Sequence, residues 1–426
     1  MQKLFSMAAA LVVLLSLTQA GLRAQEKKVK DQAEYDLFNA VQKETDLNKK
    51  VQLLNTWKEK YPDSDFKVDR QQILVQTYQG LNQGENMYRA AKDMLAMDAQ
   101  NTFALLMVNL LTESLNNTAP DRLDFGEKAA RTFMASLDKT FDESKRPQEV
   151  TPEAWKKSRT DMEVIARKTL AFVAGGRKDS AAVERELIEI LKIQPNNGNI
   201  SYSLGAALVA QRKPEKQVLA LYHFARAAYY TGENALAEAT RKQVQAYLEK
   251  VYVTYHGDKS GLPELIELAR KSPFPPQDFD IKSAQQIAIE EENRLKETNP
   301  QLALWMGVKK ELVGPNGPTY FEGSLKGAAI PKLKGKVLNQ IPALRPKEVT
   351  IDMTDDGTAE IKLRLDAPMA NKADPGTEIE FEGGIAAEFA PEPFMLTLDI
   401  EKAQVTGWPA PPRTPPAGKK GGGKKK

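Results

Sequence analysis

Apolar residues between positions 179 and 230 recur at the spacing of an α-helix. The first stripe occupies the i, i+4, i+7 and i+8 positions of one helix face, at Val183, Leu187, Ile190 and Leu191. Residues 194–198 follow it, and their proline, asparagines and glycine favour a turn. The same stripe returns further on, at Ala220, Phe224, Ala227 and Ala228. This pattern predicts three consecutive helices joined by tight turns.

Helical periodicity extends over residues 31–300. Amphipathic stripes alternate there with short polar turns, and one clear example is formed by Met87, Ala91, Met94 and Leu95. From these stripes we expect about ten to thirteen helices, packed as consecutive helix–turn–helix units.

Particular residues in this region resemble the tetratricopeptide repeat, a helix–turn–helix unit of about 34 residues. They are the pair Leu204 and Gly205 after Pro195, followed by Ala220 and Phe224. The resemblance implies a solenoid of stacked helix pairs, whose concave surface binds a peptide or a partner protein.

The end of one unit, Tyr-Pro-Asp-Ser at residues 61–64, is similar to repeat ends in tetratricopeptide proteins of the bacterial envelope. The next equivalent position, Ala99, lies further from Pro62 than one family repeat, so the repeats are divergent.

The periodicity changes from 3.6 to 2 near residue 312, which predicts strands. Apolar residues alternate with polar ones at 349–353 and 359–365, and the hairpin sequence Asp355-Asp356-Gly357 separates the two runs. With further strands near 334–339, 379–381 and 396–400, we expect about five antiparallel strands. The strand number and order resemble a small closed barrel of the OB type, and a β-sandwich is the alternative.

The predicted organisation is therefore a multidomain α + β chain. Residues 31–300 form the helical repeat domain, 301–327 a linker and 328–408 the small β domain, and two further segments lie at the ends. Residues 1–24 resemble a signal peptide, because Lys3 precedes an apolar run that ends in small residues, with cleavage after Ala20 or Ala24. This predicts export to the periplasm or envelope of a bacterium.

The other end segment, residues 409–426, is rich first in proline and then in glycine and lysine. It has too few apolar groups to bury, so we expect a disordered basic tail. Its lysines predict a weak contact with anionic envelope material.

Composition changes this picture little. The net charge is only +3, and Asp and Glu outnumber Lys and Arg between Ala328 and Trp408, which disfavours a nucleic-acid partner for the OB-like domain. The chain has no cysteine, which excludes disulfides, thiolate metal sites and a cysteine nucleophile.

Candidate catalytic chemistry is sparse. The two histidines, His223 and His256, do not have metal-ligand spacing, and we expect His223 to be a packing residue. The sequence at 352–357 is similar to the start of a calcium loop, but Leu363 stands where the loop needs a glutamate. We therefore predict no catalytic, cofactor or metal residues.

These observations predict an exported, non-enzymatic scaffold that binds protein or peptide partners through its stacked helices. The alternative is an envelope assembly or transport factor in which the β domain recognises a ligand and the helices position it.

Overall fold

The computed structural model describes residues 27–410, which form two compact units. The first unit extends to Ile281 and the second begins at Lys282. Each unit has hydrophobic core clusters of its own. The predicted signal peptide and residues 411–426 of the predicted tail lie outside the described residues.

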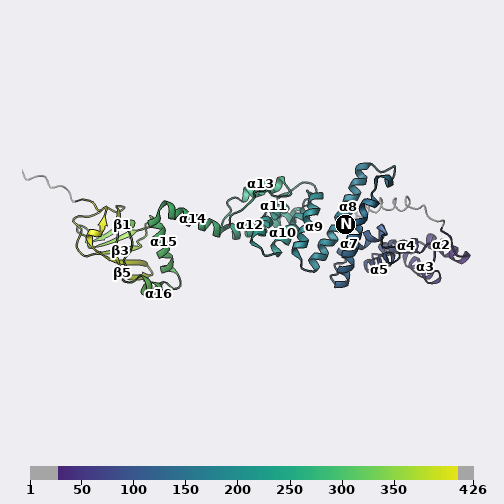
Figure 1. Ribbon diagram of the computed structural model, residues 1–426, viewed down its shortest axis with the longest axis horizontal. Helices are drawn as coiled ribbons and strands as arrows, with labels where there is room; N and C mark the ends of the chain where they lie inside the picture. Colours follow the sequence, from purple (N-terminus) through teal and green to yellow (C-terminus); the bar gives the residue numbers. More distant parts are fainter. Residues whose placement is uncertain (1–26, 411–426) are drawn as a thin grey trace, which may run out of the picture. The chain divides into compact units, whose positions relative to one another are not determined.

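The described part of the first unit is helical (Figure 1, purple to teal). From α2 to α12 each α-helix packs against the next one along the chain, and α13 packs against α11. The elements are α2 (Gln32–Lys43), α3 (Leu47–Lys60), α4 (Lys67–Gly80), α5 (Gly84–Met97), α6 (Thr102–Ser114), α7 (Pro120–Thr140), η1 (Glu143–Lys145), α8 (Pro152–Gly176), α9 (Ser180–Ile193), α10 (Gly198–Ala210), α11 (Pro214–Tyr229), α12 (Glu238–His256) and α13 (Leu262–Lys271). The predicted helical region is confirmed.

Short polar side chains begin many of these helices. An Asp, Asn or Thr at the N-cap accepts a hydrogen bond from a backbone N–H of the first turn, which would otherwise have no partner. These caps are Asp31, Asp46, Asn101, Thr151, Asp179 and Asn197. Proline begins α7, α8 and α11, where its missing N–H costs nothing. Turns of a few residues are therefore enough to join consecutive helices.

Helix α8 contributes to both core clusters of the first unit. Its residues Met162 and Leu170 are buried with the helices before it, and Val164 and Ala171 with the helices after it. The apolar residues of α8 therefore surround most of the helix, as expected for an element packed on more than one side.

The pair Leu204-Gly205 places α10 close to α11. Leu204 is buried, and a Cβ atom at Gly205 would lie 3.0 Å from the ring of Phe224. The missing side chain at Gly205 thus allows the two helices to approach each other closely.

The second unit joins helices to one sheet (Figure 1, green to yellow). Its elements are α14 (Ala284–Thr298), α15 (Pro300–Val313), α16 (Gly317–Tyr320), η2 (Phe321–Leu325), β1 (Leu333–Ile341), β2 (Glu348–Asp352), β3 (Ile361–Leu365), β4 (Glu378–Phe381), β5 (Ile385–Pro391), β6 (Phe394–Ile400), η3 (Lys402–Gln404) and β7 (Val405–Thr406). The strand order is β5-β6-β3-β2-β1-β4-β7, and every pair is antiparallel except β3 with β6.

This seven-stranded sheet is mixed and open, with β5 and β7 at its edges. The expected closed antiparallel barrel is therefore wrong for the described chain, and so is the alternative of two stacked sheets. Two strands escaped prediction: β7 has only two residues, and β5 lacks a clean alternation of apolar and polar residues. The parallel pairing of β3 with β6 is a long-range contact that no local periodicity encodes.

Residues 301–327, expected as a linker, contain most of α15 together with α16 and η2. They contribute Trp305, Leu312, Phe321 and Leu325 to the core of the second unit. Pro300, just before this segment, and Pro318 within it lie in the first turns of α15 and α16, so these prolines begin helices. The second unit consequently begins before the expected boundary of the β domain.

Replacing Gly335 of β1 by alanine is expected to lower the free energy of unfolding of the second unit by about 1–3 kcal/mol. The added Cβ would lie 2.4 Å from Cγ2 of Ile351 and 2.9 Å from the carbonyl oxygen of Asp352. Gly307→Ala on α15 is the matched control, because nothing lies within 4 Å of its Cβ position. In urea unfolding this control should gain up to about 1 kcal/mol from helix propensity. A shift of both variants in the same direction would contradict the packing at Gly335.

Candidate functional site

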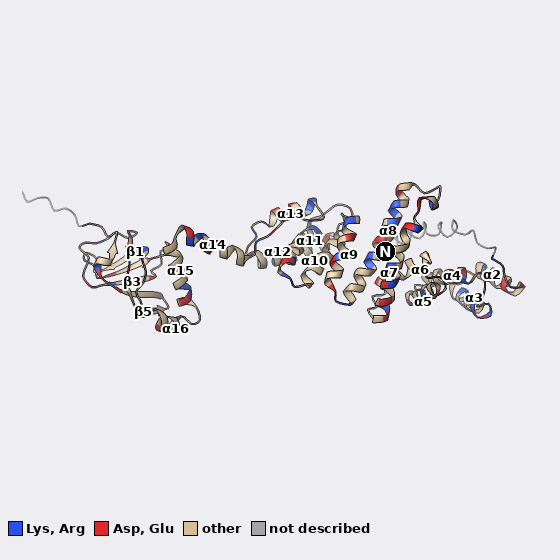
Figure 2. Ribbon diagram, viewed as in Figure 1, with Lys and Arg blue, Asp and Glu red and all other residues tan. Residues whose placement is uncertain are grey.

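The exposed face of α10 is the strongest candidate for a binding surface in the first unit. The helix contains no charged residue and is drawn entirely in tan (Figure 2). Four of its exposed residues, Tyr202, Ser203, Ala206 and Val209, define what we call the α10 face. Tyr202 and Val209 are 43% and 44% exposed, so this face leaves considerable apolar area in contact with water.

An aromatic cluster supports the α10 face from the neighbouring helices. Phe224 of α11 is buried, and its ring centroid lies 5.8 Å from that of Tyr202 and 5.2 Å from that of Tyr247 on α12. Both contacts are edge-to-face, the favourable geometry for aromatic rings. Phe224 therefore contacts two exposed tyrosines that come from different helices.

The hydroxyl groups of these tyrosines remain available for a partner. Within residues 27–410 no hydrogen bond is found for either the Tyr202 or the Tyr247 hydroxyl, and Tyr247 is 42% exposed. A surface with exposed tyrosine side chains suits protein recognition, where tyrosine is a frequent anchor.

Charged groups border this surface. Beyond the C-terminal end of α10, Lys216 forms an ion pair of 2.7 Å with Glu184, and Gln211 donates a 2.6 Å hydrogen bond to the same carboxylate. These contacts lower the pKa of Glu184 even though its burial opposes the shift. Lys216 and Glu184 therefore neutralise each other near the C-terminal end of α10.

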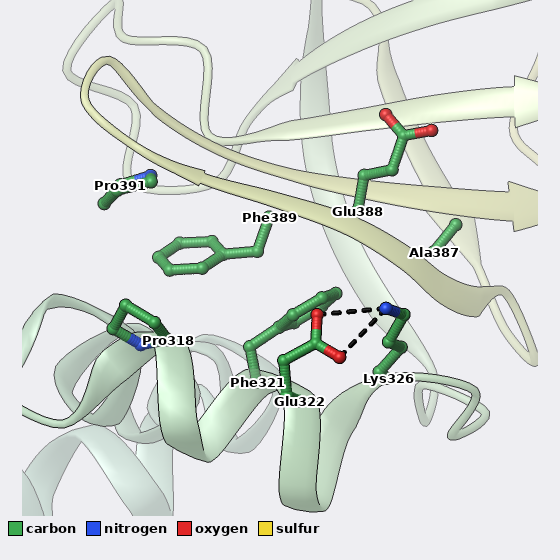
Figure 3. Close-up of a pocket in the computed structure, with 8 residues that line it drawn as sticks. All are labelled: Pro318, Phe321, Glu322, Lys326, Ala387, Glu388, Phe389 and Pro391. Atoms are coloured by element: carbon green, nitrogen blue, oxygen red, sulfur yellow. Dashed lines mark hydrogen bonds and ion pairs between the residues drawn. The ribbon is translucent and has the colours of Figure 1, made fainter.

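A second candidate is a pocket of about 280 Å³ in the second unit, between η2 and β5 (Figure 3). The rings of Phe321 and Phe389 lie 5.7 Å apart, and Pro318 and Pro391 also line the pocket. Its volume lies just below the range of about 300–1,000 Å³ that is usual for small-molecule sites.

The charged side chains of this pocket are already paired. Glu322 accepts hydrogen bonds of 2.9 and 3.0 Å from Lys326, as the dashed lines in Figure 3 show. Glu388 forms a 2.5 Å ion pair with Arg364 of β3. No uncompensated charge in the described pocket is thus directed at a ligand.

Cross-strand ion pairs cover the polar face of the sheet. Lys334 of β1 pairs with Glu378 of β4 at 2.6 Å, and Arg364 of β3 pairs with Asp399 of β6 at 2.6 Å. These pairs neutralise Lys334 and Arg364 locally, so the face does not present the continuous basic charge of a phosphate-binding groove.

The calcium-like sequence forms a turn between β2 and β3. The carboxylate of Asp352 accepts hydrogen bonds from the backbone N–H groups of Thr354, Asp355 and Gly357 at 3.0, 2.7 and 2.7 Å. This geometry confirms the prediction of a turn at these residues. In the described part of the chain, no cluster of three or more His, Asp or Glu residues suits a metal ion.

His223 is buried inside α11, beside Tyr222 and Phe274, which agrees with its expected packing role. Its Nδ1 atom has no hydrogen-bond partner within the described residues. Burial, together with the nearby Arg226 guanidinium, lowers the pKa of His223 to about 4. His256 lies at the end of α12, with its Nε2 atom 2.9 Å from the Ser260 hydroxyl.

The stability of the first unit should therefore fall as the pH drops from about 6.5 to about 4. The folded state binds this proton less tightly than the unfolded state does. Protonation of His223 therefore has no effect on the free energy of unfolding above this pH window and lowers it by about 3 kcal/mol at the lower end of the window. His223→Phe should flatten this part of the pH dependence in urea unfolding. Parallel curves for the wild type and the variant would contradict the buried neutral histidine.

Sequence reasoning assigned no site residues, and the α10 face explains why. Tyr202, Val209 and Tyr247 are ordinary apolar positions in the sequence, and only the packed helices reveal which of them face solvent. The one available signal was the absence of charge along α10.

None of the helices in residues 27–410 combines the length and the apolar character that a bilayer crossing needs. Neither the comparison with protein-family models nor that with curated proteins finds a match for this chain.

Proposed function

We propose that this protein is a non-enzymatic scaffold that binds a protein or peptide partner on the α10 face. The observation that carries the proposal is the uncharged α10 with its exposed Tyr202 and Val209, together with the exposed Tyr247 of α12, since Phe224 contacts both tyrosines. Burial of these side chains against a partner would supply the free energy of association, and the two hydroxyls would orient the partner.

The helical unit fits a divergent tetratricopeptide-like solenoid within this proposal. The consecutive packing of α2 to α12 and the close contact of Gly205 with Phe224 support it. We further propose export to the periplasm or envelope of a bacterium, on the basis of the signal-like residues 1–24.

The alternative function places recognition in the second unit. Its support is the pocket between Phe321 and Phe389, which would accept a small apolar group of a ligand. Specific ligand sites usually present polar groups to the ligand. In this pocket Glu322 and Glu388 already form ion pairs with cations of the protein. The α10 face is therefore the favoured binding surface.

Tyr202→Ala combined with Tyr247→Ala is expected to weaken partner binding by about 30-fold or more, since anchor tyrosines at interfaces contribute about 2 kcal/mol. The measurement is quantitative affinity capture from bacterial envelope extract, followed by a titration of the captured partner. Tyr35→Ala on α2 is the matched control, because that tyrosine is similarly exposed but lies on a different helix.

Tyr35→Ala should keep the melting temperature of the wild type, and the double variant should stay folded with a moderately lower melting temperature, because it loses two edge-to-face contacts with Phe224. Retention of the partner by the double variant would contradict the α10 face as the binding surface. Loss of the partner in Phe389→Ala alone would instead support the pocket of the second unit.

A further inference from the structure

The turn between β1 and β2 exposes apolar side chains at its tip. Residues 341–345 are all exposed, and we call this segment the β1–β2 tip. Leu344 is 72% exposed, more than any other large apolar side chain in residues 27–410, and Ile341 is 58% exposed. Pro342 and Ala343 lie between them. Four adjacent apolar residues thus project into water.

Hydrogen bonds hold the base of this tip in place. The N–H of Lys347 donates to the carbonyl oxygen of Ile341 at 2.8 Å, which closes the turn. Pro346 is buried, and its carbonyl oxygen accepts a 3.0 Å hydrogen bond from the N–H of Met369. The apolar residues are therefore presented outward by an anchored base.

Two cations flank the apolar residues. Arg345 and Lys347 are exposed, and neither forms an ion pair within the described residues. The nearest acidic residue along the chain, Glu348, is half-buried and stands opposite Arg364 in the strand register.

Other charged side chains near the base of the tip form hydrogen bonds or ion pairs with groups outside the tip. The carboxylate of Asp366 accepts backbone N–H groups of Ala367 and Lys402, and Lys372 pairs with Asp374 at 3.5 Å. The positive charges of Arg345 and Lys347 are therefore the uncompensated ones at the tip.

We propose that the β1–β2 tip inserts shallowly into an anionic phospholipid surface. Leu344 and Ile341 enter the boundary between headgroups and acyl chains, where their apolar area leaves water. Arg345 and Lys347 lie at the level of the lipid phosphates, where each cation gains from the negative surface potential.

The shape of the tip favours a bilayer over a protein partner. A stable protein interface buries about 800 Å² on each side, far more than five residues of a projecting turn provide. Shallow insertion requires only a few apolar side chains with adjacent cations, which is what this turn presents. The surface belongs to the second unit and is independent of the α10 face.

The test is co-sedimentation with vesicles of equimolar phosphatidylglycerol and phosphatidylcholine. It uses the chain without residues 1–24, whose apolar run would itself bind lipid. Ile341→Ser combined with Leu344→Ser should lower the partition coefficient about tenfold or more. Ile289→Ser combined with Val313→Ser is the matched control, because these residues of the same unit are also strongly exposed.

The basic residues are tested separately. Arg345→Gln combined with Lys347→Gln should lower partitioning by about 30-fold at low salt, and pure phosphatidylcholine vesicles should show a much smaller effect. Removal of residues 411–426 should leave the difference between the Ile341/Leu344 variant and its control intact, including at high salt.

Equal partitioning of the Ile341/Leu344 variant and its control would overturn the proposal. So would the absence of sedimentation by the wild type, or its complete loss on removal of residues 411–426 alone. The proposal would also be overturned if the Ile341/Leu344 variant bound vesicles normally but lost a protein partner, because the tip would then be a protein contact.

Discussion

A fragment of residues 282–410 is expected to unfold in one cooperative transition, whereas a fragment that begins at Pro318 is expected to show none. The shorter fragment lacks α15, whose Trp305 and Leu312 are each only 1% exposed within the core of the second unit. Loss of a buried tryptophan side chain alone costs about 3–5 kcal/mol, a large part of the stability of a typical domain.

A buried carboxylate adds to this effect. Glu360 precedes β3 and is fully buried, and it accepts a 2.9 Å hydrogen bond from Nε1 of Trp305. Lys309 of α15 forms an ion pair with the same carboxylate. Without α15 the carboxylate loses both of these partners.

Far-ultraviolet circular dichroism and urea unfolding of the two fragments provide the measurement. In the longer fragment, Trp305→Ala should reduce stability strongly, whereas Leu304→Ser should have little effect because that side chain is 44% exposed on the same helix. A cooperative transition of the shorter fragment at the same urea midpoint would show that α15 is dispensable, contrary to the structure.

Arg226→Ala is expected to lower the free energy of unfolding of the first unit by about 2–4 kcal/mol, because several buried or half-buried acceptors lose their donor. Arg226 of α11 is 2% exposed, and its guanidinium lies 4.3 Å from the centre of the Tyr230 ring. Nη1 donates to the carbonyl oxygens of Ala269 and Arg270, at 2.8 and 2.9 Å.

The same guanidinium also reaches the turn between α9 and α10. Nη2 donates to the carbonyl oxygen of Pro195 and to Oδ1 of Asn196, at 3.1 and 3.2 Å. One side chain thus satisfies carbonyl groups of the last turn of α13 and of a turn that begins α10. Its removal would leave these acceptors buried or half-buried without a donor.

Arg226→Lys separates charge from geometry. Lysine keeps the positive charge, but its single ammonium group cannot bridge the same two segments as a planar guanidinium, so we expect an intermediate loss. Arg185→Ala, at an exposed position of α9, is the control and should change stability by less than about 0.5 kcal/mol. An Arg226→Ala variant within the same small range would contradict the bridging role.

The helical half of the protein was largely predictable from its sequence. A 3.6-residue period is a local property, and the capping residues and turn prolines that delimit it are local as well. The stripe of Leu187, Ile190 and Leu191 is buried as expected, and Gly205 approaches Phe224 closely. The period of 2 likewise identified the central strands β1 to β4 and β6.

Sheet topology and the domain boundary required the tertiary structure. The parallel pairing of β3 with β6 depends on which distant segments meet in the fold. The strand number and order in the sequence predicted a closed barrel, and the structure has an open sheet instead. The segment with α15 resembled a linker because its prolines and glycines dominate the sequence, whereas Trp305 finds its partner Glu360 only in the folded state.

For the two candidate surfaces, too, the sequence determined one part and the tertiary structure the other. The sequence by itself determined that α10 carries no charge and that residues 341–345 are mostly apolar. Only the tertiary structure decided that Tyr202, Val209 and Leu344 remain exposed while Leu204 and Phe224 are buried. Exposure depends on contacts with neighbouring helices and strands, and those contacts join residues that are distant in the chain.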